Sequence, residues 1–410
     1  MTEKFDSVVV GSGALGASAA YHLAREGQRV ALLDRGQVAS ETSPRAAGMG
    51  MQLQADDLIS PIARHGIEKL VGFEEETGVP LQVNQSGSVK VARSESDEAQ
   101  IHDEVERAKQ MGVELDYVTP EQARQLAPWF DPGSARAMWF APGDTYLEPG
   151  DVPRAFVAAF RLAGGEVREH AEVVAIGRDG GGVTHVELAN GGRIETGSLV
   201  IAAGAWSPVV AGLADVELAL WPIRHELIIT TQIAGVNNSQ PAVRIMDAKV
   251  YARPCNGGLM FGGYEPDPLT MDLREEDAGF GIAEMPLDGE PMRKLMRLVS
   301  EEFPPLMDAE WRELRGGLTT LVPDGHFLVG PLEPVDGLWL ISGCNVGGLS
   351  TSPSLGEHLA RWIAKGERHE DLAPFDPNRF GDRYRDQEAL RLACLATYVD
   401  KYSDDEVAHV

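Results

Sequence analysis

The N-terminal segment constrains the fold of this chain more than any other part. An apolar run over residues 5–10 leads directly into Gly11-Ser-Gly-Ala-Leu-Gly16, and a second apolar run, residues 30–33, ends at Asp34. Small and apolar residues recur between the two runs at a spacing close to that of a helix. Glycines spaced G-x-G-x-x-G between a strand and a helix predict a βαβ unit that binds a dinucleotide, with the pyrophosphate at the helix N-terminus.

The context of the glycine motif gives it its weight. With 45 glycines in 410 residues, this spacing arises by chance in about one of two such chains. Here Gly11 would allow a sharp turn off the strand, Gly13 a close approach of the pyrophosphate, and Gly16 tight packing of the helix on the sheet. Asp34 stands where a carboxylate binds ribose hydroxyl groups. The alternative is an ordinary βαβ unit without a nucleotide.

Composition narrows the classes of partner. A formal net charge of −27 argues against nucleic acid and anionic membranes, so an anionic substrate would need a local basic site. The three cysteines, Cys255, Cys344 and Cys394, lie far apart, and we expect no metal site, no disulfide framework and a cytoplasmic protein. No stretch is long and apolar enough to span a membrane, and the first apolar run is interpreted as a strand rather than a signal peptide.

The rest of the chain alternates helical and extended patterns. Helices are predicted over 60–76, 95–112 and 150–163, and from Pro120 after a Thr119 cap. Glycine-rich turns within 172–194 predict a meander, which leads to a wholly apolar strand ending at Gly204. Short β-type runs within 216–320 predict an antiparallel sheet. A last buried strand, 338–342, precedes a glycine-rich loop and a helix over 352–365, with Ser350 or Thr351 as its cap.

Several short segments, in fixed order, carry a family resemblance. They are Pro44-Arg-Ala-Ala-Gly48, His225-Glu-Leu-Ile-Ile-Thr230, Tyr251-Ala-Arg253, Phe261-Gly-Gly-Tyr-Glu265, Gly316-Gly-Leu-Thr319 with Pro323-Asp-Gly325, and Arg379-Phe-Gly381 with Tyr398. Together with the N-terminal βαβ unit, they resemble the FAD-dependent amine oxidoreductases of the D-amino-acid oxidase superfamily. Within it, they are most similar to the dimethylglycine and sarcosine dehydrogenase family.

The resemblance implies an α/β (α+β) fold: a Rossmann-like FAD-binding domain of the glutathione-reductase type with an inserted antiparallel β-sheet substrate domain. We expect a discontinuous FAD-binding domain from residues 1–80, 145–215 and 320–370. Residues 81–144 and 216–319 would form the substrate-binding domain, and 371–410 a C-terminal helical extension.

The resemblance and the glycine motif together predict which residues contact FAD. These are Gly11, Gly13, Ala14, Leu15, Gly16, Asp34, Arg35, Thr42, Ser43, Arg45, Ala46, Ala47, Gly48, Met49, Val173, Val174, Ala203, Gly204, Trp206, Gly317, Asp324, Gly343, Asn345, Val346, Gly347, Gly348, Leu349, Ser350 and Thr351. The helix after the last loop would aim its positive end at the flavin.

Three departures from the family pattern concern the chemistry. Arg45 stands where the family has its flavin-linking histidine, and Gly317 stands near the cysteinyl position of related oxidases, so we expect non-covalent FAD. Met260 stands where those oxidases have an oxygen-activating lysine. The electron acceptor is therefore left open between O₂ and an electron-transfer protein.

Two residues are candidates for catalysis. His225 could accept a proton from the substrate ammonium near neutral pH, and Tyr251 could hydrogen-bond the amine or the carboxylate. Arg253 on the same strand face, or Arg45, could clamp a carboxylate, and Met260 could contact the substrate. Each has a structural alternative as a strand residue satisfied by its neighbours or as a surface ion pair.

These observations favour oxidation of a secondary or tertiary amine, such as an N-methyl amino acid, to an imine that hydrolyses. A D-amino acid, a cyclic imino acid or an opine is the alternative substrate class. A flavin subunit of a multi-protein electron-transfer complex is an alternative of another kind. An NAD dehydrogenase is disfavoured, because it would need neither the Pro44–Gly48 segment nor the C-terminal glycine-rich loop. The sequence does not indicate an oligomeric state.

Overall fold

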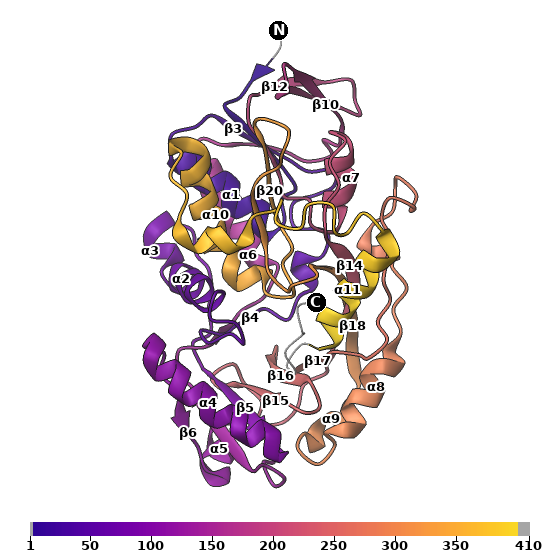
Figure 1. Cartoon of the computed structure of the whole chain (residues 1–410). Helices are drawn as coiled ribbons and strands as arrows, with labels where there is room; N and C mark the ends of the chain where they lie inside the picture. The colour runs from indigo at the N-terminus through magenta and orange to yellow at the C-terminus, as the bar shows by residue number, and fades with distance from the viewer. Residues whose placement is uncertain (1–2, 401–410) are drawn as a thin grey trace.

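A computed structural model describes residues 3–400, and its N-terminal βαβ unit belongs to a six-stranded sheet (Figure 1). The strand order is β19 (Leu328–Pro331), β20 (Leu338–Ser342), β13 (Leu199–Ile201), β2 (Ser7–Val10), β3 (Val30–Leu33) and β9 (Glu166–Arg168). All neighbours are parallel except β19 and β20. The strands β2, β3 and β13 are apolar because both faces of this sheet are covered.

Helices cover one face of this sheet and a smaller sheet covers the other. Helix α1 (Ala14–Arg25) packs against α6 (Asp151–Leu162) and α10 (Gly348–Lys365), so elements from the two ends of the chain lie side by side (Figure 1). The opposite face packs on a four-stranded sheet with the order β1 (Glu3–Lys4), β12 (Arg193–Glu195), β11 (Gly182–Leu188) and β10 (Val173–Asp179). This architecture confirms the predicted Rossmann-like fold.

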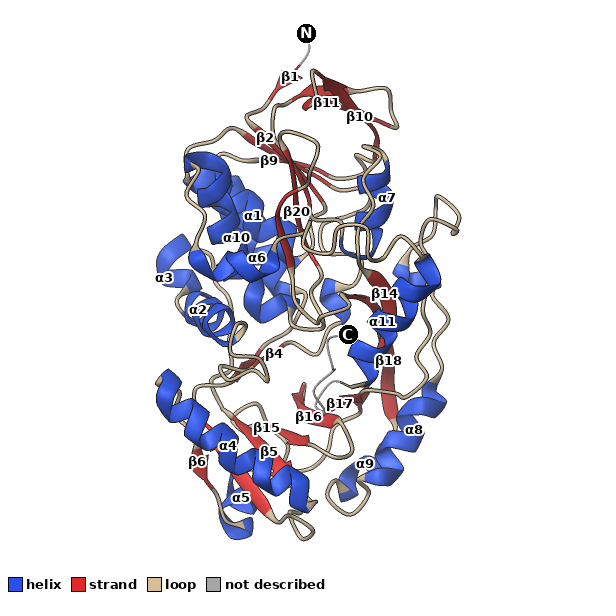
Figure 2. Ribbon diagram, viewed as in Figure 1, coloured by secondary structure: helices blue, strands red, loops and turns tan. Residues whose placement is uncertain are grey.

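An eight-stranded sheet forms the second part of the molecule (Figure 2). Its order is β18 (Trp311–Leu321), β14 (Trp221–Thr230), β17 (Gly258–Gly263), β16 (Val250–Cys255), β15 (Ala242–Ile245), β5 (Ser88–Ala92), β7 (Ala137–Ala141) and β6 (Asp116–Tyr117). The expectation of a purely antiparallel sheet is wrong at one pair, because β15 and β5 run parallel. The chain reaches β15 from β5 by a long excursion rather than by a hairpin, which permits that direction.

The two faces of the eight-stranded sheet differ. One face carries the apolar side chains of Val89, Val243 and Ile228, which pack with α8 (Gly289–Leu298) and α9 (Pro304–Asp308) in one core. The alternate positions along the same strands point to the other face, toward the six-stranded sheet. That second face carries the polar side chains described below.

The remaining elements connect these layers. They are η1 (Ser43–Arg45), β4 (Met49–Gly50), α2 (Ser60–Val71), α3 (Phe73–Thr77), α4 (Glu95–Met111), α5 (Pro120–Leu126), β8 (Thr145–Tyr146), η2 (Gly204–Trp206), α7 (Ser207–Gly212), η3 (Ile282–Glu284), η4 (Glu370–Phe375) and α11 (Gln387–Val399). None of the helices within residues 3–400 is both long and apolar enough to cross a membrane.

Two predicted helices have different bounds in the structure. The helix predicted over 60–76 is divided at Gly72 into α2 and α3. The helix predicted to begin near residue 352 begins at Gly348, with Gly347 as its N-cap. Ser350 and Thr351 do not cap it, because both hydroxyl groups donate back to the carbonyl of Gly347. The predicted start at Pro120 is confirmed, with a capping box between Thr119 and Gln122.

Helix α2 lies against the first turn of α10 at a position where only glycine fits. A Cβ on Gly66 would lie 1.9 Å from the carbonyl oxygen of Ser350. The absence of a side chain at this position therefore sets the distance between the two helices.

The predicted division into domains stays a prediction. The strands of the eight-stranded sheet come from residues 88–141 and 221–321, and those of the six-stranded sheet from 7–33, 166–201 and 328–342. Residues 401–410 of the predicted C-terminal extension lie outside the described residues.

Candidate active site

One cavity of about 750 Å³ lies between the two large sheets. On one side it begins at the carboxyl ends of the parallel strands, where Gly11, Asp34 and Ala203 line it. On the other side it reaches the polar face of the eight-stranded sheet at His225 and Tyr251. Ligands of open parallel sheets bind at the carboxyl ends of the strands, so this cavity is the candidate site.

The dinucleotide end of the cavity has the geometry that its glycines predict. Gly11 has a φ of +105°, and a Cβ there would lie 2.4 Å from the carbonyl oxygen of Ala202. A Cβ on Gly16 would lie 1.9 Å from the carbonyl oxygen of Gly11, so this residue is required for helix packing. The Asp34 carboxylate accepts hydrogen bonds from the backbone N–H of Ser12, at 2.7 Å, and from its hydroxyl group, at 2.5 Å. Asp34 therefore holds the loop in shape and also lines the cavity.

The predicted FAD contacts converge on this cavity. All of them line it except Gly16, Gly343 and Thr351. Gly343 instead makes a turn with a φ of +68°, where a Cβ would lie 2.6 Å from the side chain of Val322. Thr351 donates its hydroxyl to the Gly347 carbonyl. These three residues shape the cavity walls from behind, and the roles of the others as FAD contacts stay predictions.

The glycine-rich loop before α10 is held in a strained conformation. Asn345 and Val346 have φ values of +41° and +64°, a region that β-branched residues rarely adopt. Strand β18 holds the loop in place: the Thr320 carbonyl accepts from the Asn345 N–H at 2.9 Å, and the Thr319 hydroxyl accepts from the Val346 N–H at 3.1 Å. The first N–H groups of α10 thereby reach the cavity, where a helix N-terminus favours negative charge.

Arg45 lines the cavity but is already bound to the protein. Its guanidinium donates to the carbonyls of Ser40 and Glu41, and burial lowers its pKa from the usual value. Arg35, another predicted contact, lies over the ring of Trp206 at 3.9 Å from its centroid. These two cations are therefore fixed at the cavity wall by the elements around them.

An aromatic cluster surrounds His225 on the sheet side of the cavity. The Nε2 atom of His225 lies 2.9 Å from the hydroxyl of Tyr251, and Nδ1 lies 2.7 Å from the hydroxyl of Tyr398. The ring of Tyr264 lies 5.1 Å from that of His225. A Cβ on Gly262 would lie 2.4 Å from the Tyr251 hydroxyl, so this glycine lets Tyr251 reach across β17 to His225 on β14.

The protonation of His225 differs from the expectation. Burial lowers its pKa to about 4, so the imidazole is neutral at physiological pH and accepts a proton only weakly. A neutral imidazole has one donor and one acceptor, so one of the two phenols donates to it and the other accepts from it. The sequence analysis named Tyr398 only as part of the family resemblance and did not predict its contact with His225. No pattern in the sequence itself points to that contact.

Two predicted substrate contacts do not lie where they were expected. The Arg253 guanidinium donates to the carbonyls of Ala47 at 2.6 Å, Pro254 at 2.9 Å and Leu147 at 3.2 Å, and its side chain lies outside the large cavity. It therefore links strand β16 to neighbouring segments and does not face the cavity, as a carboxylate clamp would. Met260 is fully buried in an apolar cluster against which Ala47 packs, and it does not line the cavity.

Asp324 belongs to a charged group at the edge of the cavity. It accepts two hydrogen bonds from Arg379, at 2.7 and 2.8 Å, and lies beside His326, whose Nε2 is 2.5 Å from Asp56. The Asp324 and Asp56 carboxylates raise the pKa of His326 to about 9. His326 itself does not line the cavity.

The polar face of the sheet contributes four more cavity residues that sequence reasoning missed. Lys90, Glu104, Trp139 and Arg244 all line the cavity. Arg244, Lys90 and Trp139 are direct neighbours across β15, β5 and β7. The alternation of polar and apolar residues in these strands was the available signal, but it does not show which strands pair.

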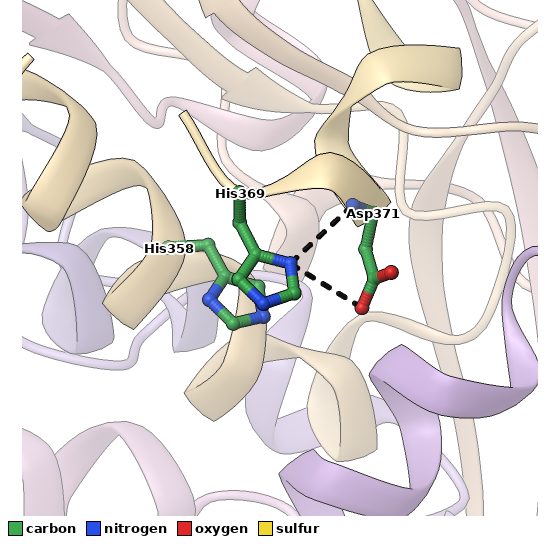
Figure 3. Close-up of side chains that lie close together, drawn as sticks. All are labelled: His358, His369 and Asp371. Carbon is green, nitrogen blue, oxygen red and sulfur yellow. Dashed lines mark hydrogen bonds and ion pairs between the residues drawn. The ribbon is translucent and has the colours of Figure 1, made fainter. Parts of the chain in front are cut away.

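A separate group of histidines lies outside the cavity (Figure 3). The rings of His358 and His369 stack at 4.0 Å with an interplanar angle of 8°, and the Nδ1 of His369 accepts the Asp371 N–H. The lone pairs of stacked rings lie in parallel planes and do not converge on one point, so this arrangement is unsuited to binding a single metal ion.

Comparison with known proteins agrees with the geometry. A family model described as FAD dependent oxidoreductase matches residues 6–362. Sarcosine dehydrogenase of Homo sapiens is 29% identical over 97% of this chain and 44% of its own length. The 4-methylaminobutanoate oxidase (formaldehyde-forming) of Paenarthrobacter nicotinovorans is 27% identical over 94% of this chain and 47% of its own. The chain thus spans about half the length of these two relatives.

Other proteins match over nearly their whole length. Glycine oxidase of Geobacillus kaustophilus is 25% identical over 92% of this chain and 98% of its own. The solved structure of L-proline dehydrogenase from P. horikoshii superposes with a TM-score of 0.81, covering 93% of this chain and 98% of that protein at 23% identity. This last likeness shows a shared fold.

Proposed function

Because this chain belongs to the family of FAD-dependent oxidoreductases, we propose that it oxidises a secondary or tertiary amine, in the form of an N-methyl amino acid. Members of this family act on the C–N bonds of amines and amino acids, and this chain is an enzyme of that kind. The names of the sarcosine and 4-methylaminobutanoate relatives favour an N-methylated substrate. The reaction converts the amine to an imine, which water hydrolyses.

One observation carries this proposal: one cavity joins a dinucleotide cradle to the neutral, half-buried imidazole of His225, which two phenols flank. When bound, FAD supplies the acceptor for the hydride equivalent that leaves the carbon next to nitrogen. Only the neutral amine gives up that hydride, and burial disfavours an ammonium ion in the same way that it disfavours the protonated form of His225.

The residues of the chain then act by orientation and exclusion of water. The neutral His225 uses both of its ring nitrogens to hold the hydroxyls of Tyr251 and Tyr398, and the Tyr251 side chain, which lines the cavity, is placed to contact a neutral amine. The carbonyls that bind Arg253 fix strand β16, which carries Tyr251, against the loop at Ala47. Positioning of this kind lowers the entropic part of the barrier.

We further propose that FAD is held without a covalent bond. Arg45 cannot form the histidyl link of the dimethylglycine and sarcosine dehydrogenase family, and its guanidinium is bound to two backbone carbonyls. Denaturing the yellow protein in acid should release the colour into the supernatant. Colour that stays with the precipitate would contradict this proposal.

The main test is anaerobic reduction of the purified holoenzyme. N-methyl amino acids should bleach the flavin absorbance, whereas D-amino acids, cyclic imino acids and opines should bleach it more slowly. His225→Gln and Tyr251→Phe should slow bleaching while FAD stays bound. Lack of bleaching by every amine in the panel would overturn the proposal, and wild-type rates in both variants would overturn the site assignment. Adding O₂ or an artificial electron-transfer acceptor afterwards identifies the class of acceptor.

A further inference from the structure

Arg244 is a buried cation whose hydrogen-bonding groups are not satisfied by the protein. Its residue exposure is 7%, and it lines the cavity from strand β15. Its Nε and Nη2 atoms are buried and have no hydrogen-bond partner among the described residues. Burying guanidinium donors without partners is costly, so a site that retains them indicates a ligand that completes the set.

The two unpartnered nitrogens are the two donors of one edge of the guanidinium. Other arginines of this chain use that same edge to hold a carboxylate. Arg93 donates from Nε and Nη2 to the two oxygens of Asp247, at 2.9 and 2.8 Å. Arg379 does the same to Asp324, at 2.7 and 2.8 Å. This paired geometry is the strongest way in which a protein binds a carboxylate.

The acidic groups near Arg244 do not occupy this edge. The two carboxylate oxygens of Asp144 accept hydrogen bonds from the Gln52 N–H, at 2.8 Å, and from the Ser88 hydroxyl, at 2.6 Å. Glu104 is bound by Lys90 and by the Trp139 indole N–H at 2.8 Å.

The ring of Trp139 stabilises the cation without using its donors. The Cζ atom of Arg244 lies 5.3 Å from the Trp139 ring centroid. This wall fixes the guanidinium in one place while leaving its hydrogen-bonding edge for another group.

The position of Arg244 relates it to the aromatic cluster. Arg244 on β15 lies directly opposite Tyr251 on β16, and the Tyr251 hydroxyl bonds His225. Directly opposed residues in a sheet have Cβ atoms about 5 Å apart on the same face. A small amino acid can therefore place its amine at the aromatic cluster and its carboxylate at the neighbouring guanidinium.

We propose that Arg244 binds the carboxylate of the substrate through Nε and Nη2 and thereby restricts this enzyme to carboxylate-bearing amines. This inference rests on the proposed amine oxidation for its biological meaning, but the binding site itself can be tested separately. It replaces Arg253, whose donors are used by backbone carbonyls.

The first test measures binding without oxidation. Butanoate has a carboxylate and no amine, and butanamide is its uncharged match. In calorimetric titrations of the holoenzyme, butanoate should bind and butanamide should not. Arg244→Met should weaken butanoate binding about 10- to 100-fold, and Arg244→Lys should recover part of it, because lysine keeps the charge but loses the paired geometry.

The control is Arg136→Met, which removes an exposed cation just before β7, where Arg136 pairs with Glu98 on the surface. It should bind butanoate as the wild type does. FAD content and the urea midpoint of each variant establish that it is folded. Equal affinity of wild type and Arg244→Met for butanoate, or no detectable butanoate binding by the wild type, overturns the proposal.

The second test uses the reaction. The flavin of the wild type should be bleached by an N-methyl amino acid at a concentration about 10- to 100-fold below that required for its methyl ester. Arg244→Met should abolish this preference, because it weakens binding of the acid and leaves binding of the ester unchanged. Bleaching without any preference for the acid would overturn the role of Arg244 while leaving amine oxidation intact. Butanoate binding without bleaching by any amine would overturn amine oxidation while leaving the carboxylate site at Arg244 intact.

Discussion

Replacing Gly66 by alanine should destabilise the enzyme and weaken its binding of FAD. The new Cβ would lie 1.9 Å from the carbonyl oxygen of Ser350 and 3.1 Å from its carbonyl carbon, whereas real Cβ atoms essentially never lie within 3.0 Å of such an atom. Helix α2 or the first turn of α10 must therefore move by about 1 Å or more. Overpacking of this kind costs about 1–3 kcal/mol, and the better helix propensity of alanine offsets about 0.5–1 kcal/mol.

The displaced residue makes the effect specific to the cofactor site. Ser350 lines the cavity and belongs to the loop-to-helix segment predicted to contact FAD. A loss of about 1.4 kcal/mol of binding free energy at that contact corresponds to a tenfold higher dissociation constant. We therefore expect Gly66→Ala to lower the free energy of unfolding of the apoprotein by about 1–2 kcal/mol and to weaken FAD binding by about tenfold.

Urea unfolding of the apoprotein and fluorescence titration with FAD measure the two effects. Gly72→Ala, at the C-cap of the same helix, is the matched control, because its Cβ would meet nothing closer than the Glu68 carbonyl oxygen at 3.5 Å. The control should bind FAD normally. The reasoning would be refuted by a Gly66→Ala protein as stable as the control and with the same affinity for FAD.

Two further predictions concern pH. His326→Gln should lower the free energy of unfolding by on the order of 1–3 kcal/mol near pH 6 and by little near pH 10. Asp324 and Asp56 raise the pKa of His326 to about 9, so the stabilisation by the charged imidazole is complete below about pH 6.5 and disappears as the pH rises through 9. Urea unfolding against pH measures this, and a loss independent of pH would contradict it. Glu265→Gln should raise stability above pH 7 and change it least below pH 4.5, because burial raises the pKa of this carboxyl from 4.5 to about 7 and the folded protein resists its ionisation. Thermal midpoints at pH 4.5 and 8 check this second prediction; an equal shift at both would be evidence against it.

The cradle was predictable because its chemistry is local. Gly16 packs against the carbonyl of Gly11 and Asp34 holds the N–H of Ser12, so these contacts lie within about thirty residues, and Gly11 needs its positive φ of +105° for the turn itself. The glycine-rich loop before α10 was also predictable from local sequence, although the helix begins at Gly348 rather than near residue 352. There the serine and threonine hydroxyls bond backward within the first turn instead of capping it.

The substrate side was less predictable because it depends on pairing between distant strands. Arg253 was chosen from its face of the strand, but the sequence does not reveal that three carbonyls converge on its guanidinium. Arg244 was missed because its proposed role depends on the pairing of β15 with β16, which sets it opposite Tyr251, and on neighbours among the described residues that leave two of its donors without a partner. Tyr398 was not placed at the site because it reaches His225 from a helix at the far end of the chain.

The strand order of the six-stranded sheet has a consequence for biosynthesis. Strand β2 and helix α1 are made first, yet β13, which pairs with β2, follows at residue 199, and α10, which covers α1, begins at residue 348. At a synthesis rate of roughly 5–20 residues per second, the apolar face of α1 waits roughly 15–65 s for its permanent cover. The nascent chain therefore has to be shielded from aggregation during most of its translation, and cofactor loading can begin only after nearly all of the polypeptide has left the ribosome.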